Sequence, residues 1–229
     1  MDIVTTAITD QLHRLINSRY PPVGLFDNYV DTAEELQDAF LIENLTNPRA
    51  NIALGAMALI PEDELIIGQP TANIAMAAFI HVDDEGSRFN DNRLGAWYAA
   101  TDIDTAIAET LYHNTRRLKA SEGGFPNVIQ LREYVTTTSS ELIDLRGMLS
   151  EAPELFEESE YTNSQAFGNA HRWPFADPAY DGIVFDSIRN DGGTNVCLFR
   201  PKALTLPITQ GAHFQYEWDW HGNSRVKRL

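Results

Sequence analysis

Three residues between Gly86 and His113 have side chains that could take part in chemistry: Arg88, Tyr98 and Glu109. Each also has an ordinary structural interpretation. An arginine beside a turn is usually a surface or ion-pairing residue, and a tyrosine in a strand usually packs in the core with its hydroxyl in water. A glutamate on a helix is usually solvated. From residue types alone, both interpretations of each residue stay open.

The elements that would position these side chains can be predicted from the local pattern. Residues 95–100, Gly-Ala-Trp-Tyr-Ala-Ala, form a small apolar run with aromatics, which is typical of a covered strand. A helix is predicted to begin near Asp102, because Thr101 and Asp104 are spaced as in a capping box. Glu109 then lies at the border of the apolar stripe of that helix, where its carboxylate can face a cleft.

A second polar block contains Ser187 and Arg189. Residues 182–199 read as two strands around the turn Asn190-Asp191-Gly192-Gly193. The glycine pair lacks the Gly-x-Gly-x-x-Gly spacing and the strand-to-helix setting, so a Rossmann dinucleotide site is disfavoured. Ser187 is not surrounded by a Gly-x-Ser-x-Gly elbow, which argues against a hydrolase-type serine nucleophile.

The two blocks together resemble a known family. The first, RFN…LGAWYAA…TAIAET, is similar to the first half of the RES domain, which is named for an arginine, a glutamate and a serine. The second, YDGIVFDSIRNDGGTNVCLFRP, is similar to that family's glycine-led strand, Ser-x-Arg step, Gly-Gly turn and following strand. The resemblance covers roughly residues 70–205.

The resemblance implies a chemistry for each residue. RES proteins degrade NAD+ at the nicotinamide–ribose bond, and their fold is similar to that of ADP-ribosyltransferases. Glu109 would stabilise positive charge on the ribose, and Arg88, assisted by Arg189, would bind the pyrophosphate. Tyr98 would offer its ring to the nicotinamide. Ser187 would donate a hydrogen bond to a phosphate, to the amide or to the attacking group.

The implied reaction needs no cofactor and no metal; NAD+ is the substrate and phosphate is a possible co-substrate. His113 lies four residues after Glu109 on the same helix face, and we expect a structural role for it, because a metal site needs at least three ligands. The sequence does not decide whether water or phosphate accepts the ADP-ribose.

The resemblance implies an NAD+ glycohydrolase or phosphorylase that is the toxin of a bacterial type II toxin–antitoxin pair, with an Xre-type helix-turn-helix antitoxin as partner. One alternative is an ADP-ribosyltransferase acting on a protein or small acceptor. Another is a catalytically silent interaction module, since activity depends on the site and not on the fold.

Composition limits the remaining classes. The net charge is −16, from 33 acidic and 17 basic residues, which argues against direct nucleic-acid binding. The single cysteine, Cys197, excludes an internal disulfide and is compatible with the cytoplasm; it is predicted to be an inert core thiol. No secretion signal is evident, and the apolar stretches 51–60 and 72–82 are too short to span a membrane. Oligomeric state stays open, with a homo-oligomer possible.

The expected fold class is α+β, because helical patterns and short strands mix without regular alternation. We expect one domain over residues 1–229, with a small mixed sheet, flanking helices and a helical N-terminal layer over residues 1–50. The predicted elements are helices over 5–17 and from residue 31, a brief strand near 65–67, a strand or buried helix over 74–82, strands over 128–135 and 141–145, a solvated helix or loop over 151–160, a helix over 163–170 and a solvated tail over 225–229.

Overall fold

The structure is a computed structural model that describes residues 2–20, 32, 34–35, 38 and 55–229. The helix predicted from residue 31 lies almost wholly outside the described residues. Within them, no helix is both long and apolar enough to cross a membrane.

The described strands form one nine-stranded sheet in the order β1-β5-β6-β7-β3-β2-β4-β8-β9. Neighbouring strands are antiparallel except β5 and β6, which are parallel. The mixed sheet with few helices confirms the α+β class, although the sheet is larger than expected. The strands are β1 (Thr5–Ala7), β2 (Leu12–Asn17), β3 (Trp97–Ala100), β4 (Asn127–Thr136), β5 (Glu141–Asp144), β6 (Gly182–Asp186), β7 (Thr194–Leu198), β8 (Thr209–Trp218) and β9 (Ser224–Arg228).

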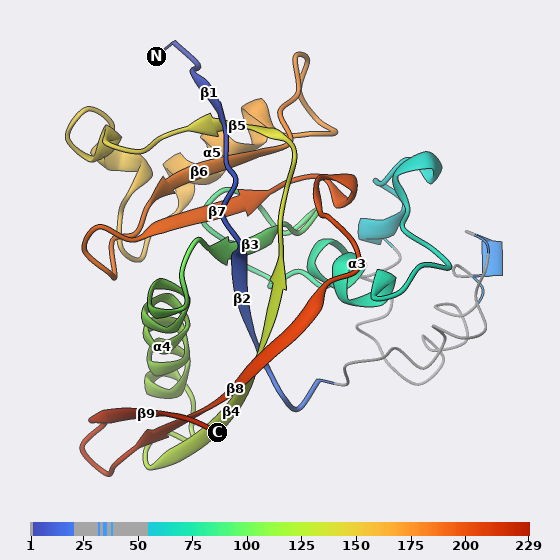
Figure 1. The fold of residues 1–229 in the computed structure, drawn as a ribbon. Coiled ribbons are helices and arrows are strands. Elements are labelled where there is room, and N and C mark those ends of the chain that lie inside the picture. Colours follow the sequence, from blue (N-terminus) through green and yellow to red (C-terminus); the bar gives the residue numbers. More distant parts are fainter. Residues whose placement is uncertain (1, 21–31, 33, 36–37, 39–54) are drawn as a thin grey trace.

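The sheet consists of two parts that meet at one place. In the described chain, β2 and β3 share a single residue pair, His13 with Ala100. On one side of this junction lie β1, β5, β6, β7 and β3, and on the other lie β2, β4, β8 and β9. In Figure 1, β6 and β7 run across the view while β4 and β8 descend from it, so the two parts differ strongly in direction.

The α-helices of the described chain that pack on this sheet are α3 (Ala72–Ile80), α4 (Ile103–Ala120) and α5 (Thr162–His171). Short 3-10 helices are η1 (Glu62–Glu64), η2 (Met148–Ser150), η3 (Pro153–Leu155) and η4 (Pro201–Ala203). The ambiguous segment 74–82 is therefore a helix. Figure 1 shows α4 beside the junction of the two sheet parts and α5 near β5 and β6.

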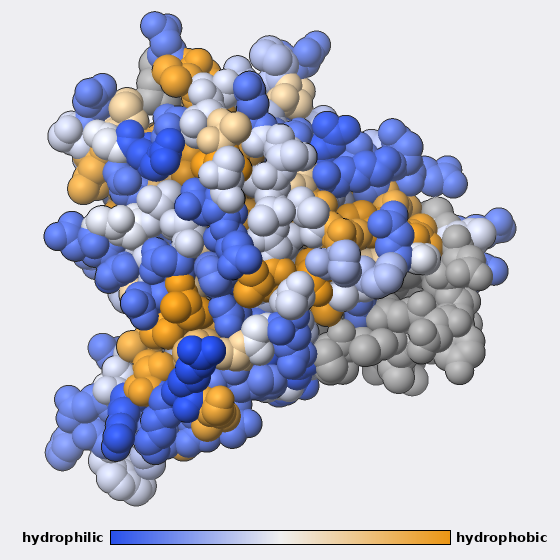
Figure 2. All heavy atoms as spheres, viewed as in Figure 1, coloured by the Kyte–Doolittle hydropathy of each residue, from blue (hydrophilic) through white to orange (hydrophobic). Residues whose placement is uncertain are grey.

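The hydrophobic core has three clusters, one for each helix. The first joins α3 to Trp97 and Leu198, and the second contains Phe89, Phe185 and Phe199 near α5. The third packs α4 on β4 and β8. On the face drawn in Figure 2, hydrophilic residues predominate and apolar residues form separate patches.

The helix predicted over residues 5–17 is wrong: these residues form β1 and β2. β2 lies between β3 and β4, and Leu12 pairs with Thr136, more than a hundred residues away. Buried Leu12 and Leu15 suit a helix by their spacing, but pairing on both edges of β2 fixes an extended backbone. The spacing of apolar residues within 5–17 carries no information about the distant strands that pair with β2.

Two smaller predictions are also wrong. Residues 65–67 form no strand; the chain there follows η1, where buried Glu64 forms an ion pair with Arg200. The C-terminal residues are not a free tail, because Ser224–Arg228 forms β9 on the edge of β8. The strand predicted over residues 95–100 is present and begins two residues later, at Trp97. The strands predicted around residues 128–135, 141–145 and 182–199 are confirmed, as is the helix over 163–170.

Candidate functional site

Glu109 is the residue on which the candidate site converges. Its Oε1 accepts a hydrogen bond of 2.7 Å from Ser187 Oγ and one of 2.6 Å from Asn195 Nδ2. Both donors therefore fix one oxygen. No hydrogen-bond partner among the described residues reaches Oε2, which leaves that oxygen for a ligand. The structure thus brings together Glu109 and Ser187, which the sequence singled out separately, in a direct contact that was not predicted.

Ser187 is oriented by the turn that follows β6. Its Oγ accepts hydrogen bonds of 3.1 Å from the backbone N–H groups of Arg189 and Asn190, the pattern of a serine-led turn. With both acceptor positions filled by the backbone, the hydroxyl proton points to Glu109. The turn closes with a bond of 2.8 Å from Ser187 N to Gly193 O.

The same turn docks on the start of α4. Asn190 Nδ2 donates to Thr105 Oγ1 at 2.8 Å, and a Cβ on Gly193 would collide with Thr105. The helix is capped by Asp102, whose Oδ1 accepts from Thr105 N at 2.8 Å, so the cap lies one residue later than the box predicted at Thr101. Ser187 and Glu109 are therefore positioned by two elements that bind each other.

Asn195 was not identified from the sequence. It lies in β7 and is 6% exposed. Cys197, two residues further along β7, pairs with Tyr98, so the side chains of Asn195 and Tyr98 lie on the same face of the sheet. A buried amide side chain needs a hydrogen-bond partner, and for Asn195 that partner is Glu109. The signal available in the sequence was one amide side chain in the run Thr-Asn-Val-Cys-Leu.

Arg88 approaches the site from the loop before β3. Its Nη1 donates to Leu155 O at 3.0 Å, and its guanidinium lies 4.9 Å from the centre of the Tyr161 ring. Burial lowers the pKa of Arg88, while the negative charge of Glu109 opposes that shift. The side chain still carries its positive charge.

Tyr98 supports the Arg88 loop. Its hydroxyl accepts from Phe89 N at 2.9 Å and donates to Asn90 Oδ1 at 2.9 Å. Burial raises the pKa of Tyr98 well above 10, so the phenol stays neutral. The prediction that Tyr98 lies in a central strand is confirmed, and its hydroxyl is occupied within the protein.

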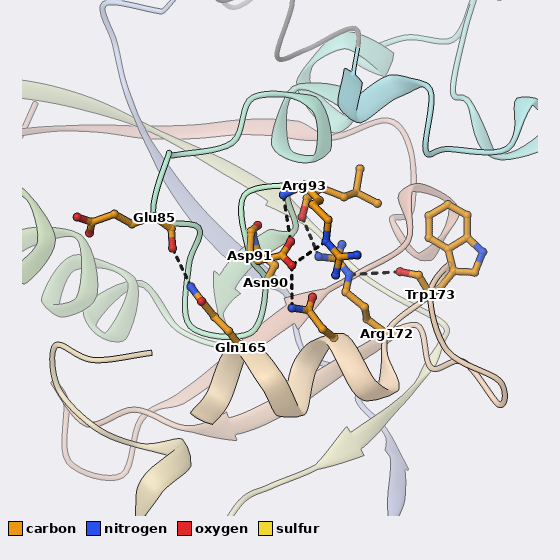
Figure 3. A network of polar contacts seen from close by, with 9 residues as sticks. Glu85, Asn90, Asp91, Arg93, Gln165, Arg172 and Trp173 are labelled. Carbon is orange, nitrogen blue, oxygen red and sulfur yellow. Dashed lines mark hydrogen bonds and ion pairs between the residues drawn. The ribbon is translucent and has the colours of Figure 1, made fainter. Parts of the chain in front are cut away.

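Helix α5 holds the other side of this loop, as Figure 3 shows for Gln165, Glu85 and Asp91. Gln165 Nε2 donates to Glu85 O at 2.8 Å and to Ser87 O at 3.1 Å, and Asn169 Nδ2 donates to Asp91 Oδ2 at 3.0 Å. These bonds bracket Arg88 on both sides along the chain. Its backbone position is thereby fixed.

Arg172, at the end of α5, is fully buried. Its Nη1 and Nη2 donate to Leu94 O and Gly95 O, each at 2.7 Å, and its Nε donates to Trp173 O at 3.3 Å, the contact drawn in Figure 3. The guanidinium binds carbonyl oxygens, and no carboxylate within the described part of the chain forms an ion pair with it. Arg172 therefore fixes the entry into β3, two residues before Trp97, and lies outside the Glu109 cluster.

Arg189 lies next to the turn that carries Ser187. Its guanidinium is 3.4 Å from the centre of the Tyr112 ring, and its side chain is 8% exposed. Nη2 donates to Glu158 O at 2.7 Å, and Nη1 lies 3.4 Å from Glu158 Oε2. The sequence pointed to Arg189 but not to Tyr112 or Glu158, because the three residues belong to segments that lie far apart along the chain.

His113 is half-buried on α4, and burial lowers its pKa while Glu109 opposes the shift. Among the described residues, no group of three His, Cys, Asp or Glu side chains could hold a metal. Cys197 is buried in β7, and burial raises the pKa of its thiol to about 12, as expected of an inert core cysteine.

Two hollows on the described surface lie away from Glu109. One, of about 550 Å³, is lined in part by Ile3, Met148 and Phe167, and the other, of about 690 Å³, by residues 17–19, 118 and 127–130. The first borders the cluster only through Leu155, whose carbonyl binds Arg88. The convergence of polar side chains on Glu109, and not a large hollow, marks the candidate site.

The chain is similar to other proteins over most of its length. The chain is 26% identical over 220 residues to the uncharacterized protein y4oC of Sinorhizobium fredii (strain NBRC 101917 / NGR234), covering 93% of this chain and 85% of that protein. A solved structure, the M. tuberculosis MbcT-MbcA toxin-antitoxin complex, contains a chain that matches with a TM-score of 0.47 and 12% identity, over 91% of this chain and 85% of that one.

The model of the RES domain matches residues 66–219, which include Arg88, Glu109 and Ser187. The two motif blocks predicted a range of about 70–205, and the match extends beyond this range at both ends. It covers well over half of the chain. This chain therefore belongs to the RES-domain family.

Proposed function

We propose that the protein is an NAD+-consuming enzyme that cleaves the bond between nicotinamide and ribose. The observation that carries this proposal is the Glu109 carboxylate, whose Oε1 is fixed by Ser187 and Asn195. A carboxylate held in one orientation is suited to stabilising a positively charged sugar.

The proposed step starts when the C1′–N bond breaks and its electron pair leaves with nicotinamide, which becomes neutral. Positive charge then develops on the ribose. Glu109 Oε2, the oxygen without a described partner, would face this charge or accept a hydrogen bond from a ribose hydroxyl. Water would complete a glycohydrolase reaction by bonding to C1′ and releasing a proton, and phosphate would complete a phosphorylase reaction by bonding to C1′.

The two arginines are the proposed pyrophosphate ligands, because guanidinium groups bind phosphate oxygens through paired N–H donors. Arg189 follows Ser187 by two residues, and its backbone N–H binds the same Ser187 hydroxyl that donates to Glu109. Tyr98 is proposed to contact nicotinamide through its ring alone, because its hydroxyl is already bound to Phe89 and Asn90.

Family membership supports a role as the toxin of a bacterial toxin–antitoxin pair in the cytoplasm, with an Xre-type antitoxin as partner. The net charge of −16 suits a partner with a basic surface. The alternative reaction, transfer of ADP-ribose to a protein or small acceptor, uses the same Glu109 and differs only in the nucleophile.

The test compares wild type, Glu109→Gln and a matched control, Glu122→Gln, at an exposed position beyond the end of α4. Each protein is incubated with NAD+, with and without phosphate, and nicotinamide is followed by chromatography. We expect release by wild type and Glu122→Gln, and a rate about 10²-fold lower for Glu109→Gln.

Dependence on phosphate would identify a phosphorylase, and NAD+ labelled in its adenosine half would reveal a transferase by covalent labelling of an acceptor. Folded wild-type protein that neither releases nicotinamide nor labels an acceptor would contradict the proposed function and favour the silent interaction module.

A further inference from the structure

One segment of the chain lies across both site arginines. Leu155 O accepts from Arg88 Nη1 at 3.0 Å, and the Tyr161 ring lies 4.9 Å from the Arg88 guanidinium. Between these two residues, Glu158 binds Arg189 through its carbonyl oxygen at 2.7 Å and its carboxylate at 3.4 Å. We call residues 155–161 the strap.

Apart from the Tyr161 ring, the groups that the strap offers to the arginines are oxygen acceptors, one of them negatively charged. Those are the groups that a diphosphate would offer to the same donors. Tyr112 adds a third contact, because its hydroxyl donates to Glu158 O at 3.3 Å while its ring stacks on Arg189. Glu158 therefore occupies the Nη1 and Nη2 groups of Arg189, the paired donors that a phosphate would use.

The strap is anchored at its ends and exposed in its middle. Leu155 and Phe156 are buried in the second core cluster, and Tyr161 begins α5. Residues 157–160 are exposed, and the side chain of Glu158 is 74% exposed. Exposed acceptors between fixed ends can leave the arginines without disturbing the core.

We propose that Glu158 is an internal competitor of the substrate diphosphate, and that residues 157–160 leave Arg189 when a diphosphate binds. This inference rests on the proposed function for its ligand class, and it adds a residue that sets affinity for that ligand. The negative charge of the strap, with glutamates at 157, 158 and 160, also opposes an approaching anion.

The first experiment measures binding and does not depend on turnover. Inorganic pyrophosphate is titrated calorimetrically into Glu109→Gln protein carrying Glu158→Ala or the matched control Glu157→Ala, which removes an equal charge at a neighbouring exposed residue. We expect Glu158→Ala to tighten binding about two- to five-fold relative to the control, the range for one exposed ion pair.

Equal affinity of the two variants would overturn the proposal, as would weaker binding by Glu158→Ala, because Glu158 would then not compete. Absence of pyrophosphate binding by every variant would also overturn it. Failure of the proposed function has a different signature: wild type would leave NAD+ intact while pyrophosphate binding still responds to Glu158→Ala.

The second experiment follows the strap itself. A glutamate-specific protease is applied to the Glu109→Gln protein with and without saturating pyrophosphate, and cleavage after Glu157 and Glu158 is quantified by mass spectrometry, with cleavage after exposed Glu122 as the internal control. Faster strap cleavage with pyrophosphate is the expected result. Slower or unchanged strap cleavage would mean that the strap stays closed over the ligand, which contradicts displacement.

Discussion

Asn195 Nδ2 donates a hydrogen bond of 2.6 Å to Glu109 Oε1, so a residue of β7 orients a carboxylate on α4. Asn195→Asp would place a second carboxylate against Glu109, and like charges at that distance raise the pKa of one of the pair. We expect nicotinamide release to fall at least about ten-fold at pH 7 and to recover in part at higher pH, where both groups ionise.

The matched variant is Asn195→Ala, which removes the donor without adding charge. Its pH profile of kcat/KM should keep the wild-type shape at a lower level. A profile for Asn195→Asp that also keeps the wild-type shape would show that the Asn195 bond does not influence the reacting carboxylate.

Ser187→Ala tests the second donor to Glu109. The change removes the bond to Glu109 Oε1 and leaves the backbone N–H groups of Arg189 and Asn190 without their acceptor. We expect a loss of about 1–2 kcal/mol in the free energy of unfolding and a fall of about ten-fold or more in kcat. Kinetics and urea unfolding of Ser187→Ala, with exposed Ser139→Ala as control, separate the two effects.

Arg172→Met tests a structural arginine that lies outside the site. It would leave the carbonyl oxygens of Leu94 and Gly95 buried without their donors. We expect the free energy of unfolding to fall by about 3 kcal/mol, measured by denaturant titration. Arg116→Met, at an exposed position on α4, should change it by less than about 0.5 kcal/mol. Equal stability of both variants would refute this role of Arg172.

His113 should make stability depend on pH. Burial lowers its pKa in the folded protein below 6.5, with Glu109 opposing and Arg117, Arg189 and Arg88 reinforcing the shift. The unfolded chain therefore binds a proton that the folded chain does not, and stability falls as the pH drops below about 6.5. The loss is complete once the pH is below the folded-state pKa.

His113→Gln removes the group that takes up a proton on unfolding, so the free energies of unfolding at pH 7.5 and pH 5 should differ less than in wild type. Each unit of pKa shift corresponds to about 1.4 kcal/mol. His221→Gln, at an exposed turn position, is the control and should follow wild type at both pH values. A His113→Gln protein with the wild-type pH dependence would remove His113 as the cause.

The sequence predicted those parts of the site whose signals are local. The apolar run around Tyr98, the helix after Asp102 and the turn at residues 190–193 each depend on neighbours in the chain, and each is present. The same pattern failed at β2, because Leu12 and Leu15 are placed by strands that come more than eighty residues later. Helical spacing of a few apolar residues does not exclude a strand that is paired on both edges.

The contacts within the site could not be predicted in the same way. The bonds of Glu109 join residues separated by 78 and 86 positions, and Arg189 meets Tyr112 and Glu158 only in the folded chain. The family resemblance supplied Arg88, Glu109 and Ser187 as a set. It did not supply Asn195, which the geometry adds.

The narrow junction between the two sheet parts gives α4 a mechanical role. The helix is tied to the first part through Glu109 and Asn195, and to the second part by Thr110 with Tyr216 and by Trp218 Nε1 with Thr115 Oγ1. Since β2 and β3 contribute one residue pair to that junction, α4, which carries Glu109, also connects the two parts. Amide exchange along α4 would therefore report the opening of the whole scaffold, and a partner that bent the two parts against each other would silence the site without entering it.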